Sequence, residues 1–209
     1  MNILESLQWR YATKKFDSDF ALTSEQIHIL KESFNLTATS FGLQPIKLII
    51  IENKELRESL VPYAFGQRQI VEASHLFVIC IQKESSVADV ENYFKLVKEV
   101  RNTPDEILAP FKEYLTGTVS KAEKKDLQEA AKSQAYIALG NLLTVCATQK
   151  IDSCPMEGFN PSKFDEKLNL DRHNLKSVLL LPVGKRAKDD YMADLKKVRK
   201  PLDTIIIEM

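Results

Sequence analysis

Apolar side chains recur along the chain with distinct spacings, and each spacing predicts a type of element. Residues 2–13 carry apolar side chains four positions apart, which is typical of one face of a helix. A second helix is predicted to open at Thr23, because Thr23 and Gln26 have the spacing of a capping box. Further helices are predicted over residues 54–63, 87–101 and 104–115.

The longest predicted helix opens at Ser120 and ends near Gln149. Ser120 and Glu123 have the spacing of another capping box. Residues 135–147 are apolar nearly all round, which is typical of a helix that is buried on every side. We therefore expect this helix at the centre of one layer of the fold.

Runs of β-branched and apolar residues predict strands at 46–52, 75–82 and 175–183. The run at 75–82 is almost unbroken, as expected of a strand that is covered on both faces. Residues 204–208 also favour a strand, which needs a partner because an unpaired apolar strand invites aggregation. These elements predict one α+β domain over residues 1–209, with four or five strands and helices on both faces.

Composition narrows the function classes. The chain has 29 Lys and Arg against 29 Asp and Glu, which argues against a nucleic-acid surface. Its apolar stretches are far shorter than the ~20 residues of a membrane span, and no signal peptide is evident, so we expect a cytoplasmic protein. The closest glycines, Gly140 and Gly158, lie 18 positions apart, which excludes a glycine-rich dinucleotide fingerprint and a P-loop.

Histidine and cysteine offer little chemistry. No spacing typical of a metal site occurs, so no metal is predicted. His75 begins a strand, and we interpret it as a structural hydrogen-bonding residue. Cys80 and Cys146 lie in apolar segments and are predicted core residues, whereas the loop position of Cys154 makes it a candidate for solvent access.

Two basic clusters are the more informative feature. Arg10, Lys14 and Lys15 fall within six positions, and residues 185–200 contain seven Lys or Arg against three Asp. One interpretation is a solvated surface. The other is an anion site, because Arg10 and Lys14 would share one side of a helix and Lys197 and Arg199 one face of an extended segment. Two such pairs that converge would hold a phosphate without a glycine loop.

Motifs spread over the whole chain resemble those of the FMN-dependent nitroreductase family, which includes oxygen-insensitive nitroreductases and dihydropteridine reductases. The motifs occur in the family's order. They are Arg10-Tyr-Ala-Thr-Lys-Lys-Phe-Asp, the loop TATSFGLQP at 37–45, Gly66-Gln-Arg-Gln followed by Glu72-Ala-Ser-His, Gln134-Ala-Tyr, Gly140-Asn, Pro155-Met-Glu-Gly-Phe, Leu181-Pro-Val-Gly and Lys197-Val-Arg-Lys-Pro.

The resemblance implies a bound FMN and assigns its contacts. Arg10, Lys197 and Arg199 would bind the phosphate. Lys14 would lie at the pyrimidine edge of the flavin and raise its reduction potential. The backbone of Glu157 and Gly158 would face the hydride-accepting nitrogen. The remaining implied contacts are Tyr11, Ala12, Gly66, Gln69, Gln134, Pro155 and Met156, with Thr39, Ser40 and Gly42 reaching the flavin from a second subunit.

The resemblance also implies a fold, an assembly and a reaction. The fold would be an α-β-α sandwich with a mixed, mostly antiparallel sheet, in a homodimer whose sites are shared. The C-terminal arm at 200–209 would add its strand to the partner. NADH or NADPH would reduce the flavin, and a nitroaromatic or quinone would reoxidise it in a ping-pong reaction in which no side chain is an essential acid or base. Alternative acceptors are a pteridine, an enone or free flavin, and a non-catalytic flavin-binding dimer is a further alternative.

A lid region is implied at about residues 87–118. Its Arg101, Phe111 and Tyr114, together with Lys14 and Gln69, are the implied contacts for the nicotinamide and the acceptor. Several positions depart from the family pattern: Ala12 replaces a serine, Gly42 and Gly66 replace asparagines of some members, and Gln69 replaces a lysine. These departures leave the acceptor and the choice between NADH and NADPH open.

Overall fold

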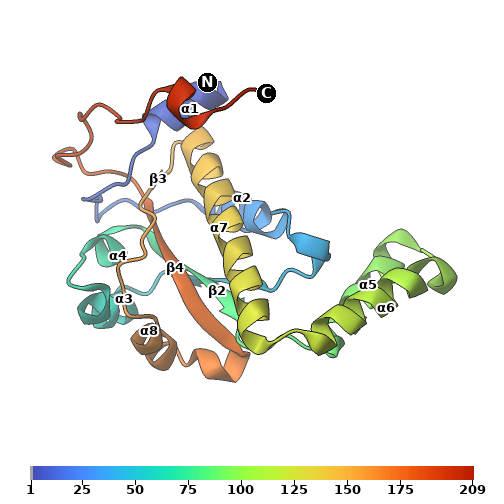
Figure 1. The fold of residues 1–209 in the computed structure, drawn as a ribbon. Coiled ribbons are helices and arrows are strands. Elements are labelled where there is room, and N and C mark those ends of the chain that lie inside the picture. Colours follow the sequence, from blue (N-terminus) through green and yellow to red (C-terminus); the bar gives the residue numbers. More distant parts are fainter. Residues whose placement is uncertain (1) are drawn as a thin grey trace.

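A computed structural model describes residues 2–209, in which a four-stranded sheet lies between two layers of helices (Figure 1). All neighbouring strands pair antiparallel, and an isolated parallel bridge joins Ala12 to Ser153. The spatial order is β1-β2-β4-β3. The strands are β1 (Ile46–Ile51), β2 (His75–Gln82), β3 (Asp152–Ser153) and β4 (Leu175–Gly184).

Strand β2 shows why its sequence is an unbroken apolar run. Side chains alternate between the two faces of a strand. Leu76, Val78 and Cys80 therefore join the core on one face of the sheet. Phe77, Ile79 and Ile81 join the core on the other. Both sets are buried, so the strand has no polar face, and the predicted core position of Cys80 is confirmed.

The two helical layers are built from segments that are far apart in sequence. Helices α2 (Ser24–Asn35) and α7 (Lys124–Thr148) pack together on one face, with α1 (Ile3–Trp9) beside α7. The opposite face is covered by α3 (Lys54–Leu60), α4 (Gln69–Glu72) and α8 (Pro161–Lys167). Short 3-10 turns complete the fold at η1 (Ser40–Gly42), η2 (Val61–Ala64) and η3 (Leu170–His173). The predicted α-β-α sandwich is confirmed.

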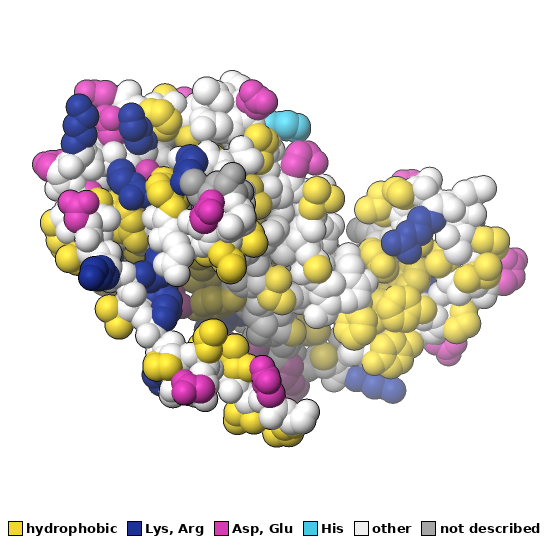
Figure 2. All heavy atoms as spheres, turned by 90° about the horizontal axis from the view of Figure 1, so that it is seen from above, with side chains coloured by type: hydrophobic (Ala, Val, Ile, Leu, Met, Phe, Trp, Pro, Cys, Tyr) yellow, Lys and Arg dark blue, Asp and Glu magenta, His cyan; other side chains and the backbone are white. Residues whose placement is uncertain are grey.

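Helices α5 (Val87–Arg101) and α6 (Asp105–Lys121) form the lid region, which projects from the body (Figure 1). The pair has a small core of its own made by Val90, Phe94 and Leu115. Many of its other apolar side chains are exposed and gather on the lid surface (Figure 2). A protruding helix pair with an exposed apolar surface is typical of a segment that meets another molecule.

Three predicted helix features are wrong. The first helix ends at Trp9, because the chain turns extended at Arg10, whose backbone N–H closes the last turn on Ser6. Ser120 does not cap a helix: it lies within α6, where its hydroxyl donates to the Thr116 carbonyl. Helix α7 is not buried all round, since the side chains of residues 136 and 137, a tyrosine and an isoleucine, are 40% and 53% exposed.

The predicted strand at 204–208 is also wrong for the chain by itself. Residues Leu202–Ile205 form the short helix α9, and the chain then ends in an extended segment that is exposed. Leu202 and Ile207 are 71% and 81% exposed, so the described residues 2–209 leave this arm largely uncovered. Among residues 2–209 no helix is long and apolar enough to cross a membrane.

Candidate functional site

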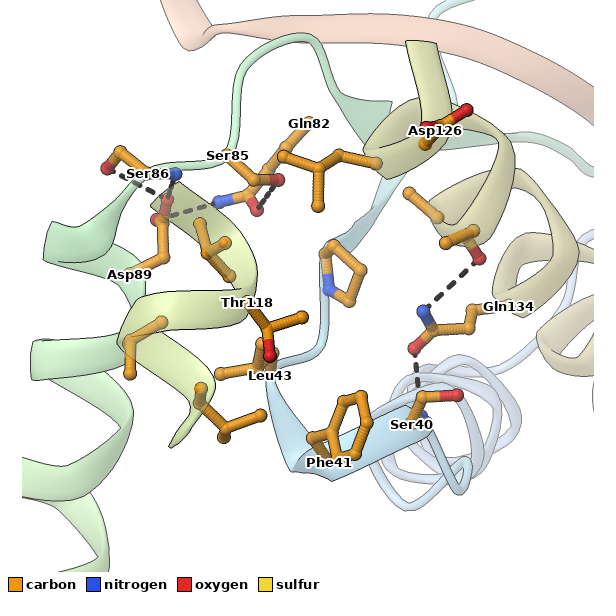
Figure 3. Close-up of a pocket in the computed structure, with 17 residues that line it drawn as sticks. Ser40, Phe41, Leu43, Gln82, Ser85, Ser86, Asp89, Thr118, Asp126 and Gln134 are labelled. Carbon is orange, nitrogen blue, oxygen red and sulfur yellow. Dashed lines mark hydrogen bonds between the residues drawn. The ribbon is translucent and has the colours of Figure 1, made fainter. Parts of the chain in front are cut away.

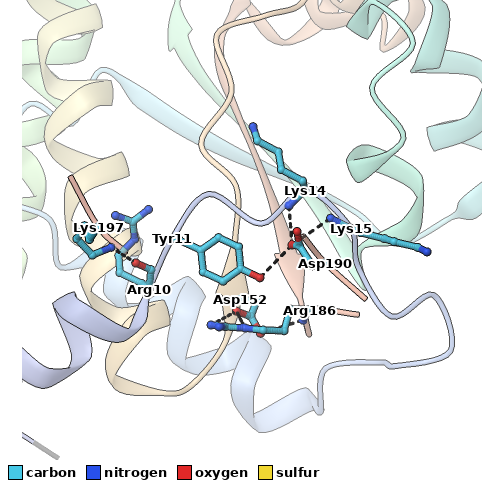
Figure 4. A network of polar contacts seen from close by, with 8 residues as sticks. All are labelled: Arg10, Tyr11, Lys14, Lys15, Asp152, Arg186, Asp190 and Lys197. Carbon is cyan, nitrogen blue, oxygen red and sulfur yellow. Dashed lines mark hydrogen bonds and ion pairs between the residues drawn. The ribbon is translucent and has the colours of Figure 1, made fainter. Parts of the chain in front are cut away.

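The two ends of the chain bring three cations together. Lys197 donates through Nζ to the backbone carbonyl of Arg10 (Figure 4). Burial lowers the pKa of Arg10, and the positive charge of Arg199 lowers it further. Burial likewise lowers the pKa of Lys197, followed by the charges of Arg10 and Arg199. Arg10, Lys197 and Arg199 therefore lie within reach of one another's charges, without Lys14, and we call these three residues the basic cluster.

The basic cluster lacks a negative partner. Within residues 2–209 neither Arg10, Lys197 nor Arg199 forms an ion pair with a carboxylate. The Nε atom of Arg10 is buried and has no hydrogen-bond acceptor. Like charges held together without a counterion disfavour their own charged forms. A bound anion such as a phosphate would supply both the missing charge and the missing acceptor.

Arg10 and Lys14 are not placed by one helix, as the sequence suggested, but by an extended segment. The bridges Ala12 to Ser153 and Phe16 to Arg186 anchor this segment to the body. Lys14 and Lys15 then project in different directions (Figure 4). Lys15 pairs with Asp189, whereas Lys14 forms no ion pair with the described part of the chain. Lys14 is thus a cation that is free to face a ligand.

A buried polar network that sequence reasoning missed holds the extended segment. The Arg186 guanidinium donates to Asp152 at 2.7 Å and lies over the rings of Trp9 and Tyr11, both at 4.4 Å from the ring centroid. The Tyr11 hydroxyl donates to Asp190 at 2.9 Å. Asp190 directly follows Lys188 and Asp189 in a charged segment, and no spacing in the sequence marks it as different from its neighbours.

Residues 155–158 continue from strand β3 along β4, from the end of the sheet where Ala12 meets Ser153 toward Leu180. The Met156 backbone pairs with Leu180, which leaves Glu157 and Gly158 exposed. The Gly158 carbonyl accepts from Gln67 at 2.6 Å, and the Glu157 carboxylate accepts from the Tyr136 hydroxyl at 2.5 Å. The backbone predicted to face the reactive part of a flavin is therefore accessible and held on both sides.

The structure also shows the surroundings of three further residues, Cys154, Gly66 and Gln69. Cys154 is 1% exposed, so its candidacy for solvent access is wrong. Burial raises the pKa of its thiol, against the charges of Lys14 and Arg10, which lower it. Gly66 is exposed and adopts a left-handed φ of 74°, which favours glycine. Gln69 is only 8% exposed and lies in α4.

A second group of predicted site residues lies at the base of the lid region. The Ser40 backbone N–H donates to the Gln134 side chain at 3.0 Å, while the buried hydroxyl of Thr39 has no partner. A Cβ on Gly42 would stand 2.9 Å from the Tyr93 ring, so the loop approaches α5 as closely as glycine allows. Behind this loop is a largely apolar cavity of about 270 Å³ that Phe41, Leu43 and Gln134 help to line (Figure 3).

Aromatic side chains connect this loop to the lid region. The Phe41 ring centroid lies 6.3 Å from that of Phe111 and 6.4 Å from that of Tyr114. Phe111 and Tyr114 are stacked, and both are partly exposed. We call these three residues the aromatic group. Arg101 is the last residue of α5 and is exposed.

The predicted site residues therefore form two sets within one chain. The first holds the basic cluster, Tyr11, Ala12, Lys14, Gly66, Gln69 and residues 155–158, and the second holds Thr39, Ser40, Gly42, Gln134 and the lid residues. Across residues 2–209 no hydrogen bond or ion pair joins a predicted residue of one set to a predicted residue of the other. His75 belongs to neither set: its ring bonds the Ser74 hydroxyl at 2.8 Å, in keeping with the predicted structural role.

An antiparallel sheet between two helical layers, with a protruding apolar lid and an uncompensated basic cluster as a candidate anion site, defines an α+β protein. The model of the Nitroreductase family matches residues 7–185, and the chain belongs to this family. It is 28% identical to the oxygen-insensitive NAD(P)H nitroreductase of Enterobacter cloacae, with 100% of both chains covered.

Two further comparisons agree with this assignment. The chain is 34% identical to YfkO of Bacillus subtilis strain 168, which is named as an NAD(P)H nitroreductase, over 75% of this chain and 74% of that one. A crystal structure from Exiguobacterium sibiricum 255-15, described as a nitroreductase in complex with FMN, superposes with a TM-score of 0.88 at 20% identity. That superposition covers 100% of this chain and 98% of the other.

Proposed function

We propose that this protein is an FMN-dependent NAD(P)H oxidoreductase. The observation that carries the proposal is the basic cluster, which combines three converging cations with a buried guanidinium nitrogen that has no acceptor. A phosphate monoester is a dianion with several acceptor oxygens, so it matches this donor set in charge and in geometry. The names of the relatives, which specify NAD(P)H, and the FMN in a neighbour of the same fold support the proposal.

The other residues of the first set fit the ring of the same cofactor. Lys14 brings a positive charge, which stabilises an anion at the pyrimidine edge. The exposed backbone of Glu157 and Gly158 offers an N–H to the ring, and the bond from Gln67 holds that backbone in place. Gly66 leaves room where a side chain would project. FMN, when bound, supplies hydride transfer between a nicotinamide and an acceptor.

We further propose a homodimer in which each flavin contacts both chains. Nitroreductases are generally dimeric and act on small molecules. Among residues 2–209 no hydrogen bond or ion pair joins the second set to the first, which fits a second copy as the source of Thr39, Ser40 and Gly42. Large apolar side chains are exposed on α1, α7, the lid region and the arm, as expected of a surface that a partner buries.

In this dimer the arm of one chain would lie on the sheet of the other. Strand β1 is the edge of the sheet and has the sequence Ile-Lys-Leu-Ile-Ile-Ile, and an unpaired apolar edge is a template for another strand. The exposed segment Thr204–Glu208 has matching propensity. Pairing of the arm of one chain with β1 of the other would satisfy both. The same proposal places the protein in the cytoplasm, where its three free cysteines stay reduced.

The aromatic group favours flat acceptors. Phe41, Phe111 and Tyr114 present ring faces and edges beside a largely apolar cavity, and aromatic rings prefer stacked or edge-on neighbours. Nitroaromatics and quinones are planar and accept electrons from a reduced flavin. We therefore propose them as acceptors, which take their turn in the site after the oxidised nicotinamide has left.

A comparison of two ligands tests the proposed cofactor. Flavin-free protein is titrated with FMN and with riboflavin, which has the same ring but no phosphate, while flavin fluorescence is followed. We expect one FMN per chain and an affinity at least about 100-fold above that for riboflavin, since two charge-assisted hydrogen bonds contribute about 1.5 kcal/mol each. Equal affinity for the two flavins, or no binding of either, would contradict the proposal.

A further inference from the structure

Asp190 is the point where the two ends of the chain are fastened together. Its carboxylate is 3% exposed. Oδ2 accepts from the Tyr11 hydroxyl at 2.9 Å and from the backbone N–H groups of Lys14 at 2.9 Å and Lys15 at 3.2 Å. Oδ1 accepts from the Met192 backbone N–H at 3.0 Å (Figure 4). One side chain thus ties residues 11–15 to the segment that leads to Lys197 and Arg199.

The carboxylate of Asp190 is held by neutral donors and not by a cation. Lys15 pairs with Asp189, and Arg186 pairs with Asp152. Burial alone would raise the pKa of Asp190, but the N–H groups of Met192, Lys14 and Lys15, together with the Tyr11 hydroxyl, outweigh it and lower the pKa. A buried carboxylate without an ion pair is costly for stability unless its acceptors are used. The Asp190 carboxylate accepts from the backbone N–H groups of Lys14 and Lys15 and so fixes the backbone at these two residues.

The backbone around Lys14 is held from two sides. On one side its N–H is bonded to Asp190, and on the other the Lys15 carbonyl accepts from the Ala187 N–H at 2.9 Å. The Lys14 side chain points away from the Asp190 carboxylate (Figure 4). Its ammonium forms no ion pair with residues 2–209. The direction in which the Lys14 ammonium points therefore depends on these two backbone contacts.

We propose that Asp190 is a positioning residue for the redox reaction: it fixes the Lys14 backbone so that the Lys14 ammonium stands at the flavin ring and raises the reduction potential of the flavin. This inference rests on the proposed function, because it needs a bound flavin. It adds to that function a residue outside the motifs of the resemblance.

The sign of a potential shift separates positioning from a direct effect of charge. A carboxylate near a flavin disfavours the anionic reduced form, so the loss of its charge would by itself raise the potential. A misplaced Lys14 would lower it. Asp190→Asn removes the charge and also places an amide NH₂ where an acceptor is needed. Asp190→Glu keeps the charge and moves the acceptor atoms by one methylene, so its effect reports position alone.

The experiment measures the two-electron potential of protein-bound FMN by equilibration with a reference dye, in the wild type and in both Asp190 variants. We expect both variants to lower it, with about a tenfold loss in the reduced-to-oxidised ratio at fixed potential, which is about 30 mV. Asp189→Asn is the matched control: it removes the same charge one residue away, at an exposed position, and should leave the potential unchanged. A rise or no change in the Asp190 variants would overturn the inference.

A double-mutant cycle tests whether the effect passes through Lys14. Lys14→Gln is expected to lower the potential, and adding Asp190→Glu to it should cause no further fall. An equal further fall would show that Asp190 acts independently of Lys14 and would overturn the inference. Having two Asp190 variants keeps the test decisive if one of them does not fold. A wild type that binds no FMN would contradict the proposed function, whereas bound FMN with an unaltered potential would contradict this inference alone.

Discussion

Replacing Arg10 by methionine should weaken cofactor binding and stabilise the flavin-free protein at the same time. Arg10 is the most enclosed member of the basic cluster, since its side chain is half-buried while Arg199 is exposed. Without a ligand it carries a buried Nε that lacks an acceptor and a charge that Arg199 repels. Methionine fills a similar volume without charge, and it keeps the backbone carbonyl to which Lys197 donates.

The structure sets the size of both effects. A hydrogen bond to a charged group contributes about 1.5–3 kcal/mol, so the Kd for FMN should rise by about 10- to 150-fold. Removing one unsatisfied buried donor from the flavin-free protein should gain about 1 kcal/mol, which for a chain of this length raises Tm by about 2–4 °C. The gain is modest because the Arg10 side chain is only half-buried.

Two measurements check these opposite signs. Fluorescence titration gives the Kd for FMN, and thermal unfolding of the flavin-free protein gives Tm. Arg172→Met serves as the control, because Arg172 is exposed in η3 and has no carboxylate partner among the described residues, so it should change neither quantity. A Kd within twofold of the wild type would show that the phosphate does not bind at Arg10. A fall in Tm of several degrees would show that the charge and the unsatisfied Nε of Arg10 do not destabilise the flavin-free protein.

Three further outcomes are expected. Truncation after Pro201 should weaken the dimer in sedimentation experiments, and a truncated chain that stays equally dimeric and stable would refute the role of the arm. Phe111→Ala should raise KM for a flat nitroaromatic by about 2- to 12-fold, from the ~0.5–1.5 kcal/mol of an aromatic contact, and an unchanged KM would refute the proposed contact. Native protein should react slowly with a thiol reagent, since burial raises the pKa of Cys80 and Cys146 to about 12 and Cys154 is enclosed. Rapid reaction of one thiol per chain would contradict this expectation.

Local signals in the sequence predicted elements well where the surrounding fold agrees with them. The capping box of Thr23 and Gln26 forms as expected, with reciprocal bonds of 3.2 and 3.0 Å. The strand at 75–82 has the predicted bounds, because its alternating side chains enter two separate cores. In both cases the pattern and the tertiary contacts favour the same conformation.

The errors arise where a contact distant in sequence decides the conformation. The apolar spacing of residues 2–13 includes Tyr11, but the Tyr11 ring packs under Arg186 and its hydroxyl bonds Asp190, which needs an extended chain. Ser120 has capping spacing by coincidence inside a helix that continues to Lys121. The apolar arm has strand propensity, but among residues 2–209 it pairs with none of the four strands of the sheet.

The sequence predicted which residues form the basic cluster, but it did not predict the residues that hold them in place. Family motifs pointed to Arg10, Lys197 and Arg199, and the structure brings these three together. The residues that hold them, Arg186 and Asp190, lie in a charged segment where neither periodicity nor spacing singles them out. Their role depends on burial, which is a property of the folded chain and not of the local sequence.

Binding of FMN and transfer of electrons from a nicotinamide to a separate acceptor can be observed in one experiment. The FMN-loaded protein is mixed anaerobically with NADH and, separately, with NADPH while the visible flavin absorbance is followed. We predict that at least one of them bleaches the flavin, and that a nitroaromatic or quinone, added after the nicotinamide is removed, restores the colour. An FMN-loaded protein that neither nicotinamide bleaches would contradict the account.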